Sequence, residues 1–377
     1  MILGTVIVAL AALGCAEPEP EASAASEPGR RQGFVDLEIG EIDGEDAYVF
    51  GSVSGIALDS ADRVFVSDFQ AHEVRVFDAD GVFRFAFGGE GDGPGEFVRP
   101  CCLGWGPDGH LWVYDSGNRR YSGFRILGDG AELAETVRGR HQGANEFVPV
   151  TFDAAGRLVD VGALPQEDGA FDIVRIHLAG RPDGDSAHVI ESAPPEEVGP
   201  FMYNRNPGRF FLWQPHGPRH LVAHGPGGRW ARAVTSEYRV ELHRPGAPSV
   251  AIENRSVEGP ALTAEEREQA ESEIAEQVSS LDIPRGDVPY GVPDRKPPVR
   301  TMWFDARGRL WIERNVVGSQ RVADVYDSLG IRQIGYRWPA RVDAERFRWA
   351  SADVLLGITR DSLGVQRVAR VRFTDGR

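Results

Sequence analysis

Short segments in which apolar and polar residues alternate follow one another along the chain, from about residue 34 to its end. Residues 74–77, 83–87 and 238–242 show the alternation clearly. Such alternation is typical of β-strands that bury one face. Turns containing Asp and Gly, such as residues 78–81 and 106–109, separate the segments and are the residue types that tight turns favour. The pattern therefore predicts a chain built almost wholly from short strands.

One strand pattern recurs, in which a turn holding Asp or Gly is followed by Arg or His and then by three β-prone residues. In the first three copies, Val64, Leu111 and Leu158 are spaced by 47 residues. That period, with three or four strands in each unit, predicts a propeller blade. Closing a ring of blades covers the faces that a single blade would expose. Six copies predict a six-bladed β-propeller, and they begin at Asp62, Gly109, Gly156, Arg219, Gly308 and Ala352.

The ring also has to close and to accommodate a long insertion. The last unit, residues 344–377, has room for about three strands, so residues 34–39 are expected to complete it and to bring both termini into one sheet. The insertion covers about residues 253–298, between the fourth and fifth units. Residues 264–279 predict the single helix, because Thr263 and Glu266 form a capping box at its start. This helix either covers one mouth of the ring as a lid or rests on its rim.

The beginning of the chain predicts an export signal and a lipid anchor. Residues 2–14 are apolar and uncharged, which suits a signal peptide but is too short for a membrane-spanning helix. Residues 12–15, Ala-Leu-Gly-Cys, resemble a bacterial lipoprotein lipobox, which implies lipidation of Cys15. Residues 16–33 are rich in Pro, Glu, Ala and Ser and predict a disordered tether. We expect a protein of the bacterial cell envelope, facing the periplasm or the cell surface, whose only membrane contact is its lipid.

A further resemblance concerns the repeats themselves. Residues 115–124, Asp-Ser-Gly-Asn-Arg-Arg-Tyr-Ser-Gly-Phe, are similar to the NHL repeat, and residues 67–77 are a looser copy. Together with residues 93–97, Gly-Pro-Gly-Glu-Phe, and the lipobox, they make the chain resemble the bacterial six-bladed β-propeller lipoproteins, NHL-repeat-like. The resemblance implies that Asp68 and Asp115 bind backbone amides in the following turns and are structural. Related gluconolactonase-like propellers use acidic and Asn ligands, so a calcium ion is the alternative for such residues.

Charge narrows the range of partners. The chain carries 41 Lys and Arg against 57 Asp and Glu, a net charge of −16. An acidic protein repels phosphate backbones, so nucleic acid is disfavoured as a partner. We expect a monomer that contacts an envelope protein, a glycan or a small ligand.

The adjacent pair Cys101-Cys102 is the most unusual local feature. If Cys15 is lipidated, only these two cysteines remain, and an oxidising compartment permits a disulfide between them. Such a disulfide would form a rigid apolar knob able to stack on a ligand; the alternative is two free, buried thiols. Arg99, Asn118 and Arg119 are further candidates for ligand contact on the same ring face.

Metal and catalytic motifs are not predicted. His216, His220 and His224 are spaced by four, but Pro and Gly around them exclude a helix. On a strand, His220 and His224 would stand about 12 Å apart or more. Residues 51–55, Gly-Ser-Val-Ser-Gly, place valine where a nucleophile elbow needs serine. No catalytic residue, metal ligand or cofactor is assigned, with calcium or zinc the ions to consider.

Two functions remain open at this point. The first is a non-enzymatic binding or scaffold module that holds a small molecule, glycan, peptide or protein on one ring face. The alternative is a metal-dependent enzyme, a lactonase-type hydrolase or a lyase, with ligands from several blades at the central channel. Because folds of this kind carry many functions, the fold does not decide between them.

Overall fold

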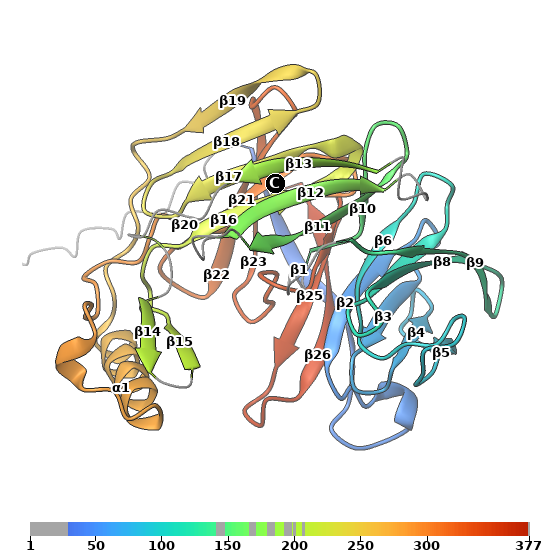
Figure 1. The fold of residues 1–377 in the computed structure, drawn as a ribbon, viewed down its shortest axis with the longest axis horizontal. Coiled ribbons are helices and arrows are strands. Elements are labelled where there is room, and N and C mark those ends of the chain that lie inside the picture. The colour runs from blue at the N-terminus through green and yellow to red at the C-terminus, as the bar shows by residue number, and fades with distance from the viewer. Residues whose placement is uncertain are drawn as a thin grey trace, which may run out of the picture.

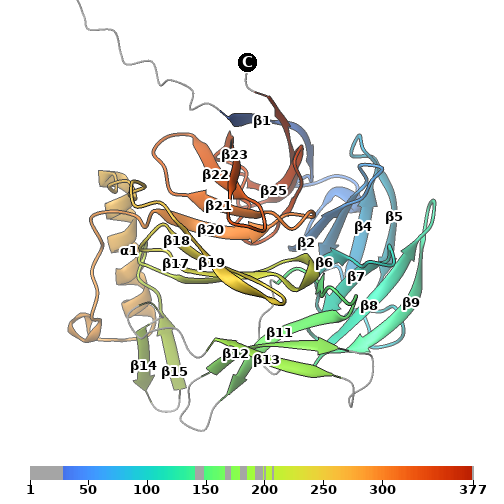
Figure 2. The same cartoon turned by 90° about the horizontal axis from the view of Figure 1, so that it is seen from above.

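In a computed structural model of the chain, six small sheets are arranged around a common axis (Figures 1 and 2). The structure describes residues 29–140, 148–165, 171–178, 185–191, 198, 201–205 and 208–375. Strands follow one another along each blade in chain order and pair antiparallel with their neighbours. The first strands of neighbouring blades contact one another, as β2 does with β6 and β16 with β20. These first strands therefore line the centre of the ring.

The strands group into six blades, as the repeat period predicts. The first three blades are β2 (Val53–Leu58), β3 (Val64–Asp68), β4 (Glu73–Phe77) and β5 (Phe83–Gly88); β6 (Pro100–Trp105), β7 (Leu111–Asp115), β8 (Arg120–Ile126) and β9 (Ala131–Arg138); and β10 (Thr151–Phe152), β11 (Leu158–Pro165), β12 (Phe171–Leu178) and β13 (Ser186–Glu191). The last three are β16 (His220–His224), β17 (Trp230–Val234), β18 (Arg239–Arg244) and β19 (Ala247–Glu253); β20 (Val299–Phe304), β21 (Leu310–Arg314), β22 (Gln320–Tyr326) and β23 (Arg332–Pro339); and β24 (Trp349–Ala350), β25 (Val354–Arg360) and β26 (Gln366–Thr374), completed by β1 (Arg30–Ile39).

The N-terminal strand closes the ring, as predicted. Most of β1 pairs antiparallel with β26, with Val35 opposite Val371 and Ile39 opposite Val368. Its first residues also pair parallel with β23, with Arg31 opposite Tyr336, so blades five and six form one eight-stranded sheet. The strand begins at Arg30, earlier than the predicted start at residue 34, so residues 30–33 belong to the propeller and not to the tether. The predicted signal segment and residues 16–28 lie outside the described residues.

A recurring Asp turn explains why Arg follows the turn in the repeat. In blades one, three and five, Asp59, Asp153 and Asp305 each accept the side chain of the arginine four residues later, with Nε–Oδ2 distances of 2.7, 2.8 and 2.7 Å. The other carboxylate oxygen accepts that arginine's backbone amide at 2.9 to 3.0 Å. The turn between the first and second strands is thus closed on itself, and its sequence can recur wherever such a turn is needed.

The fourth copy of the repeat was assigned one strand too early. Residues 220–224 form β16, the first strand of blade four, whereas the other copies mark second strands. The second strand is β17, which follows Gly228 and Arg229 and therefore carries the same turn signature. An inserted hairpin between blades three and four, β14 (Phe201–Arg205) and β15 (Gly208–Leu212), lengthens the spacing and conceals this correspondence.

The helix α1 (Ala264–Ser280) forms as predicted within the insertion between β19 and β20. Thr263 Oγ1 accepts the Glu266 amide at 3.2 Å, and Glu266 Oε2 accepts the Thr263 amide at 3.1 Å. Its buried face packs on the β14–β15 hairpin through a small apolar cluster that includes Leu212 and Val278. Helix and hairpin lie at the periphery in both views, and Figure 2 shows the helix beside the strands of blade four (Figures 1 and 2), which places the helix on the rim. No helix in the described part of the chain is both long and apolar enough to cross a bilayer.

Candidate functional site

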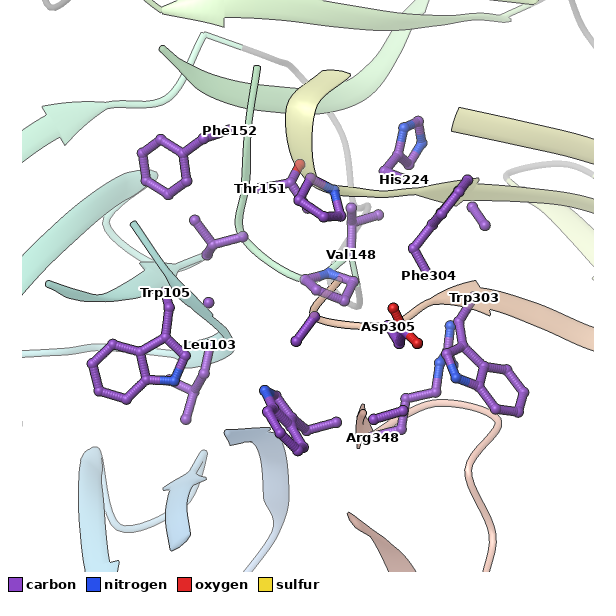
Figure 3. A pocket seen from close by; sticks show the side chains of 18 of the residues that line it. Leu103, Trp105, Val148, Thr151, Phe152, His224, Trp303, Phe304, Asp305 and Arg348 are labelled. Carbon is purple, nitrogen blue, oxygen red and sulfur yellow. The ribbon is translucent and has the colours of Figure 1, made fainter. Parts of the chain in front are cut away.

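A cavity of about 350 Å³ lies in the central channel and is bounded by all six blades (Figure 3). Its lining comes from the first strands and from the turns that follow them, which places it toward the ring face that carries the first-to-second-strand connections. Each blade supplies at least one lining residue; examples in chain order are Ile56, Leu103, Phe152, Ala223, Trp303 and Ala350. Its volume falls within the range of small-molecule pockets, roughly 300–1,000 Å³.

Aromatic rings make up much of the cavity wall. Figure 3 shows Trp105 and Phe152 on one side and Trp303 and Phe304 on the other, and Trp349 also lines the cavity. The Trp105 indole donates to the Leu58 carbonyl at 2.8 Å, and Trp303 stacks on Trp311 with ring centroids 5.8 Å apart. Because their partners hold these rings in place, the aromatic part of the wall is rigid.

The two carboxylates at the wall are already saturated by their own turns. Asp305 accepts the amides of Arg307 and Arg309 on one oxygen, and Arg309 Nε and Trp311 Nε1 on the other, at 2.7 to 3.0 Å. Asp153 accepts three hydrogen bonds from its own turn in the same way, and His177 Nδ1 lies 3.0 Å from its second oxygen as a fourth partner. Neither carboxylate is therefore positioned to bind a further cation.

The third charged residue at the wall, Arg348, makes no direct contact with a carboxylate of the described residues, although Glu313, Glu345 and Asp343 lie close enough to favour its charged form. Its guanidinium donates to the carbonyls of Ala344, Glu345 and Met302 and lies over the Trp303 ring, 5.1 Å from the centroid. No Asp or Glu of the described chain is within ion-pair distance of it, and its Nε has no hydrogen-bond partner there. Burial lowers the pKa of Arg348 to about 10, so it remains charged at neutral pH.

Several neutral polar groups complete the wall. Thr151 Oγ1, His224 Nδ1 and Trp303 Nε1 are buried and have no hydrogen-bond partner among the described residues. Leaving a buried polar group unpaired costs about 1–3 kcal/mol, so such groups are characteristic of places where a further molecule binds. Burial, reinforced by the nearby Arg175 charge, lowers the pKa of His224 to about 3. His224 is therefore a neutral imidazole at any ordinary pH.

A second cavity, of about 240 Å³, contains two of the predicted ligand-binding residues. Arg99 and Cys101 line it together with Arg346 and Arg360. Arg99 lies over the Phe69 ring, 5.0 Å from its centroid. Along the first strand of blade two, Cys101 lines this cavity and Leu103 lines the channel cavity. The two cavities thus lie toward opposite ends of this strand.

The structure contains a Cys101–Cys102 disulfide, one of the two alternatives that the sequence left open. Both residues are buried. Cys102 has a φ of +57°, and the pairing of β6 with β7 shifts register between Cys101 and Leu103. The disulfide therefore sits in a bulge of the inner strand, between the two cavities.

The predicted structural aspartates have the contacts that the resemblance implies. In the following turns, Asp68 accepts the Gln70 amide at 3.0 Å and Asp115 accepts the Gly117 amide at 3.2 Å. Asp68 also accepts the amides of Gly51 and Ser52, and Asp115 those of Val98 and Arg99, at 2.8 to 3.1 Å. Each ties the end of a second strand to the loop that leads into its own blade.

The remaining predicted candidates lie apart from both cavities. The Asn118 amide donates to the Gly91 carbonyl at 3.0 Å and to Asp115 at 2.7 Å, so it holds the loop in place. Arg119 is exposed in the following turn. His220 and His224 stand at opposite ends of β16. Within the described ranges, no three His, Cys, Asp or Glu residues lie close enough to hold a metal ion.

Sequence reasoning missed the channel cavity. The sequence alone singled out neither Trp105 nor Trp303 as a site residue, and it suggested His224 only as a metal ligand. One signal was available: in four blades the residue just before the first turn is Trp105, Phe152, His224 or Phe304. Aromatic and imidazole side chains at that position of a propeller repeat all face one channel.

The comparisons with known proteins agree with the architecture. The sequence profile of a family described as 6-bladed beta-propeller (DUF5128) matches residues 33–102, and together with the six sheets it defines the chain as a six-bladed β-propeller. No curated protein sequence matches the chain.

Solved structures resemble the chain at low sequence identity and with TM-scores below 0.5. A DUF4221 family member from Bacteroides vulgatus has a TM-score of 0.45 at 10% identity, covering 92% of this chain and 99% of that one. The PQQ-bound aldose sugar dehydrogenase of Streptomyces coelicolor has a TM-score of 0.42 at 12% identity, covering 92% of this chain and 99% of that one. A catalytically inactive virginiamycin B lyase of Staphylococcus aureus with quinupristin has a TM-score of 0.37 at 10% identity, covering 88% of this chain and 83% of that one.

Proposed function

We propose that the protein is a lipid-anchored binding protein of the bacterial cell envelope, and that its propeller holds a small molecule in the channel cavity. One observation carries the proposal. A cavity of ligand size, bounded by all six blades, combines fixed aromatic rings with buried polar atoms that have no partner among the described residues. Ligand pockets typically combine an apolar lining with a few such polar groups.

The anchoring part of the proposal is supported by the start of the chain. The lipobox-like residues 12–15 end at Cys15, and β1 begins at Arg30. An extended chain of residues 16–29 spans up to about 45 Å at about 3.3 Å per residue, which would hold the propeller near the membrane while leaving it free to turn. Replacing Cys15 by Ser should release the protein from the membrane fraction, as detected by fractionation and intact mass. Unchanged membrane association of the Cys15→Ser variant would contradict the anchor.

Blocking the cavity mouth tests the binding function. Ala306 is exposed and lines the cavity directly after Asp305, so Ala306→Trp should fill its entrance without disturbing the core. Ser60 occupies the same position of the same turn in blade one, directly after Asp59, and does not line the cavity. Ser60→Trp is therefore the matched control.

The measurement is a thermal-shift screen with a library of small aromatic and sugar fragments. A fragment present at ten times its Kd stabilises the folded state by about 1.4 kcal/mol, which raises the Tm by roughly 2 °C for a domain of this size. We expect fragments that raise the Tm of the wild type and of Ser60→Trp but not of Ala306→Trp. A library without any such fragment, or with shifts that survive in Ala306→Trp, would overturn the proposal.

A further inference from the structure

We infer that the channel cavity is built for a flat aromatic anion, such as a small aromatic carboxylate, and discriminates against cations. The inference rests on the proposed function and adds to it the chemical class of the ligand. Shape, charge and hydrogen bonding at the cavity wall each support it.

The shape of the wall favours a flat ring. Phe152 packs edge-on against Trp112, with ring centroids 5.6 Å apart, and Trp105 packs edge-on against Phe65, with centroids 5.4 Å apart. Trp303 and Phe304 lie on the opposite side of the cavity (Figure 3). Aromatic groups placed between such rings gain offset-stacking and edge-to-face contacts of about 0.5–1.5 kcal/mol per pair beyond the burial of their area.

The charges at the wall favour an anion. Each carboxylate there, Asp153 and Asp305, is neutralised by the arginine of its own turn and already accepts four hydrogen bonds. Arg348 makes no such contact, and Glu313, Glu345 and Asp343 act on its charge only from a greater distance. The residue is partly exposed and lines the cavity. Because no carboxylate of the described residues touches this guanidinium, a ligand carboxylate beside Arg348 would be stabilised and a ligand ammonium repelled.

The neutral polar groups favour acceptors on the ligand. Trp303 Nε1 and Arg348 Nε can only donate, and both lack a hydrogen-bond partner among the described residues. The Thr151 hydroxyl and the neutral His224 ring can donate or accept. The two groups that can only donate, Trp303 Nε1 and Arg348 Nε, therefore need acceptors, and the oxygens of a carboxylate are suitable acceptors.

Three naphthalene probes with the same ring test the inference by isothermal titration calorimetry: 2-naphthoate, its methyl ester and 2-naphthylmethylammonium. We expect 2-naphthoate to bind at least tenfold more tightly than the ester, and the ammonium more weakly than the ester. Equal affinities of the acid and the ester, or tightest binding of the ammonium, would overturn the inference.

Two variants assign the preference to Arg348. Arg348→Met should abolish the preference for the acid over the ester. Arg219→Met removes the same charge from a residue that is half exposed, pairs with Glu345 and does not line the channel cavity, so it should retain the preference. If Arg348→Met does not fold, Arg348→Lys replaces it and should keep 2-naphthoate ahead of the ester. A retained preference in Arg348→Met, or its loss in Arg348→Lys, would contradict the role of Arg348.

The outcomes for the ligand class and for the proposed function are distinguishable. If the fragment screen finds ligands that Ala306→Trp excludes, but none of the naphthalene probes binds, the cavity is a ligand site and the ligand class is wrong. If Ala306→Trp does not weaken the binding of any ligand, the proposed function fails together with the inference.

Discussion

Arg370 on the last strand holds Asp36 on the first strand in a bidentate ion pair, with Nε–Oδ1 and Nη2–Oδ2 distances of 3.0 Å each. The third guanidinium nitrogen donates to the Ala79 carbonyl of blade one at 2.8 Å. One side chain therefore joins both ends of the chain to the neighbouring blade. The Arg370 side chain is only 7% exposed, so its charge depends on Asp36 for compensation.

The Asp36→Asn substitution should weaken this closure. A hydrogen bond to a charged group contributes about 1.5–3 kcal/mol, so we expect the free energy of unfolding to fall by about 2–3 kcal/mol, measured by urea denaturation. Asp129→Asn is the control, because Asp129 is 71% exposed in its pair with Arg84 and such surface pairs contribute less than about 1 kcal/mol. Equal losses in the two variants would show that the pair does not hold the ring closed.

The stability of the protein should fall as the pH is lowered, with His224 as one cause. In the folded state its pKa is about 3, whereas the unfolded chain takes up the proton near pH 6.5. The contribution of neutral His224 is therefore complete above pH 6.5 and declines as the pH falls toward 3. Between pH 6.5 and 4.5 the wild type should lose about 2–3 kcal/mol more than His224→Gln.

Chemical denaturation at several pH values measures this difference. The control is His220→Gln, at the partly exposed first position of the same strand, and it should retain the wild-type pH dependence. Parallel stability curves for the wild type and His224→Gln would contradict a buried neutral imidazole.

The vicinal disulfide predicts a specific mass. Protein isolated without reductant should weigh two hydrogen atoms less than the reduced form and should not react with iodoacetamide when unfolded. Reduction before alkylation should then label both Cys101 and Cys102. Two alkylated cysteines without prior reduction would show free thiols and remove the disulfide from the channel wall.

The architecture was predictable because the turn between the first and second strands is encoded locally in blades one, three and five. Each turn that binds its own arginine, as Asp305 binds Arg309, marks the passage from a first to a second strand within a few residues. The last unit of the sequence has room for only about three strands, which predicted that the N-terminal strand completes the sixth blade. The second strand of blade four was predicted wrongly at residues 220–224, because the inserted hairpin alters the repeat spacing. The turn signature of that blade lies instead just before Trp230, at Arg229.

The channel cavity was not predictable in the same way. Its residues come from strands as far apart as Ile56 and Ala350, and each alone is indistinguishable from a core residue. What distinguishes Arg348 is that its guanidinium donates to carbonyls and touches no carboxylate of the described residues, which is a property of three-dimensional packing. Cys101 could be chosen from the sequence because it belongs to an unusual pair of adjacent cysteines. Asn118, a ring-face candidate like Arg99, looked equally available until its hydrogen bonds to Gly91 and Asp115 were seen.

A crystal structure of the protein soaked with 2-naphthoate would test the central claim most directly. The account predicts electron density for the naphthalene ring in the channel cavity, between the Trp105 and Trp303 sides, with the carboxylate within hydrogen-bond distance of Arg348. Density only on the outer surface or in the second cavity beside Arg99, with the channel cavity free of ligand, would contradict it.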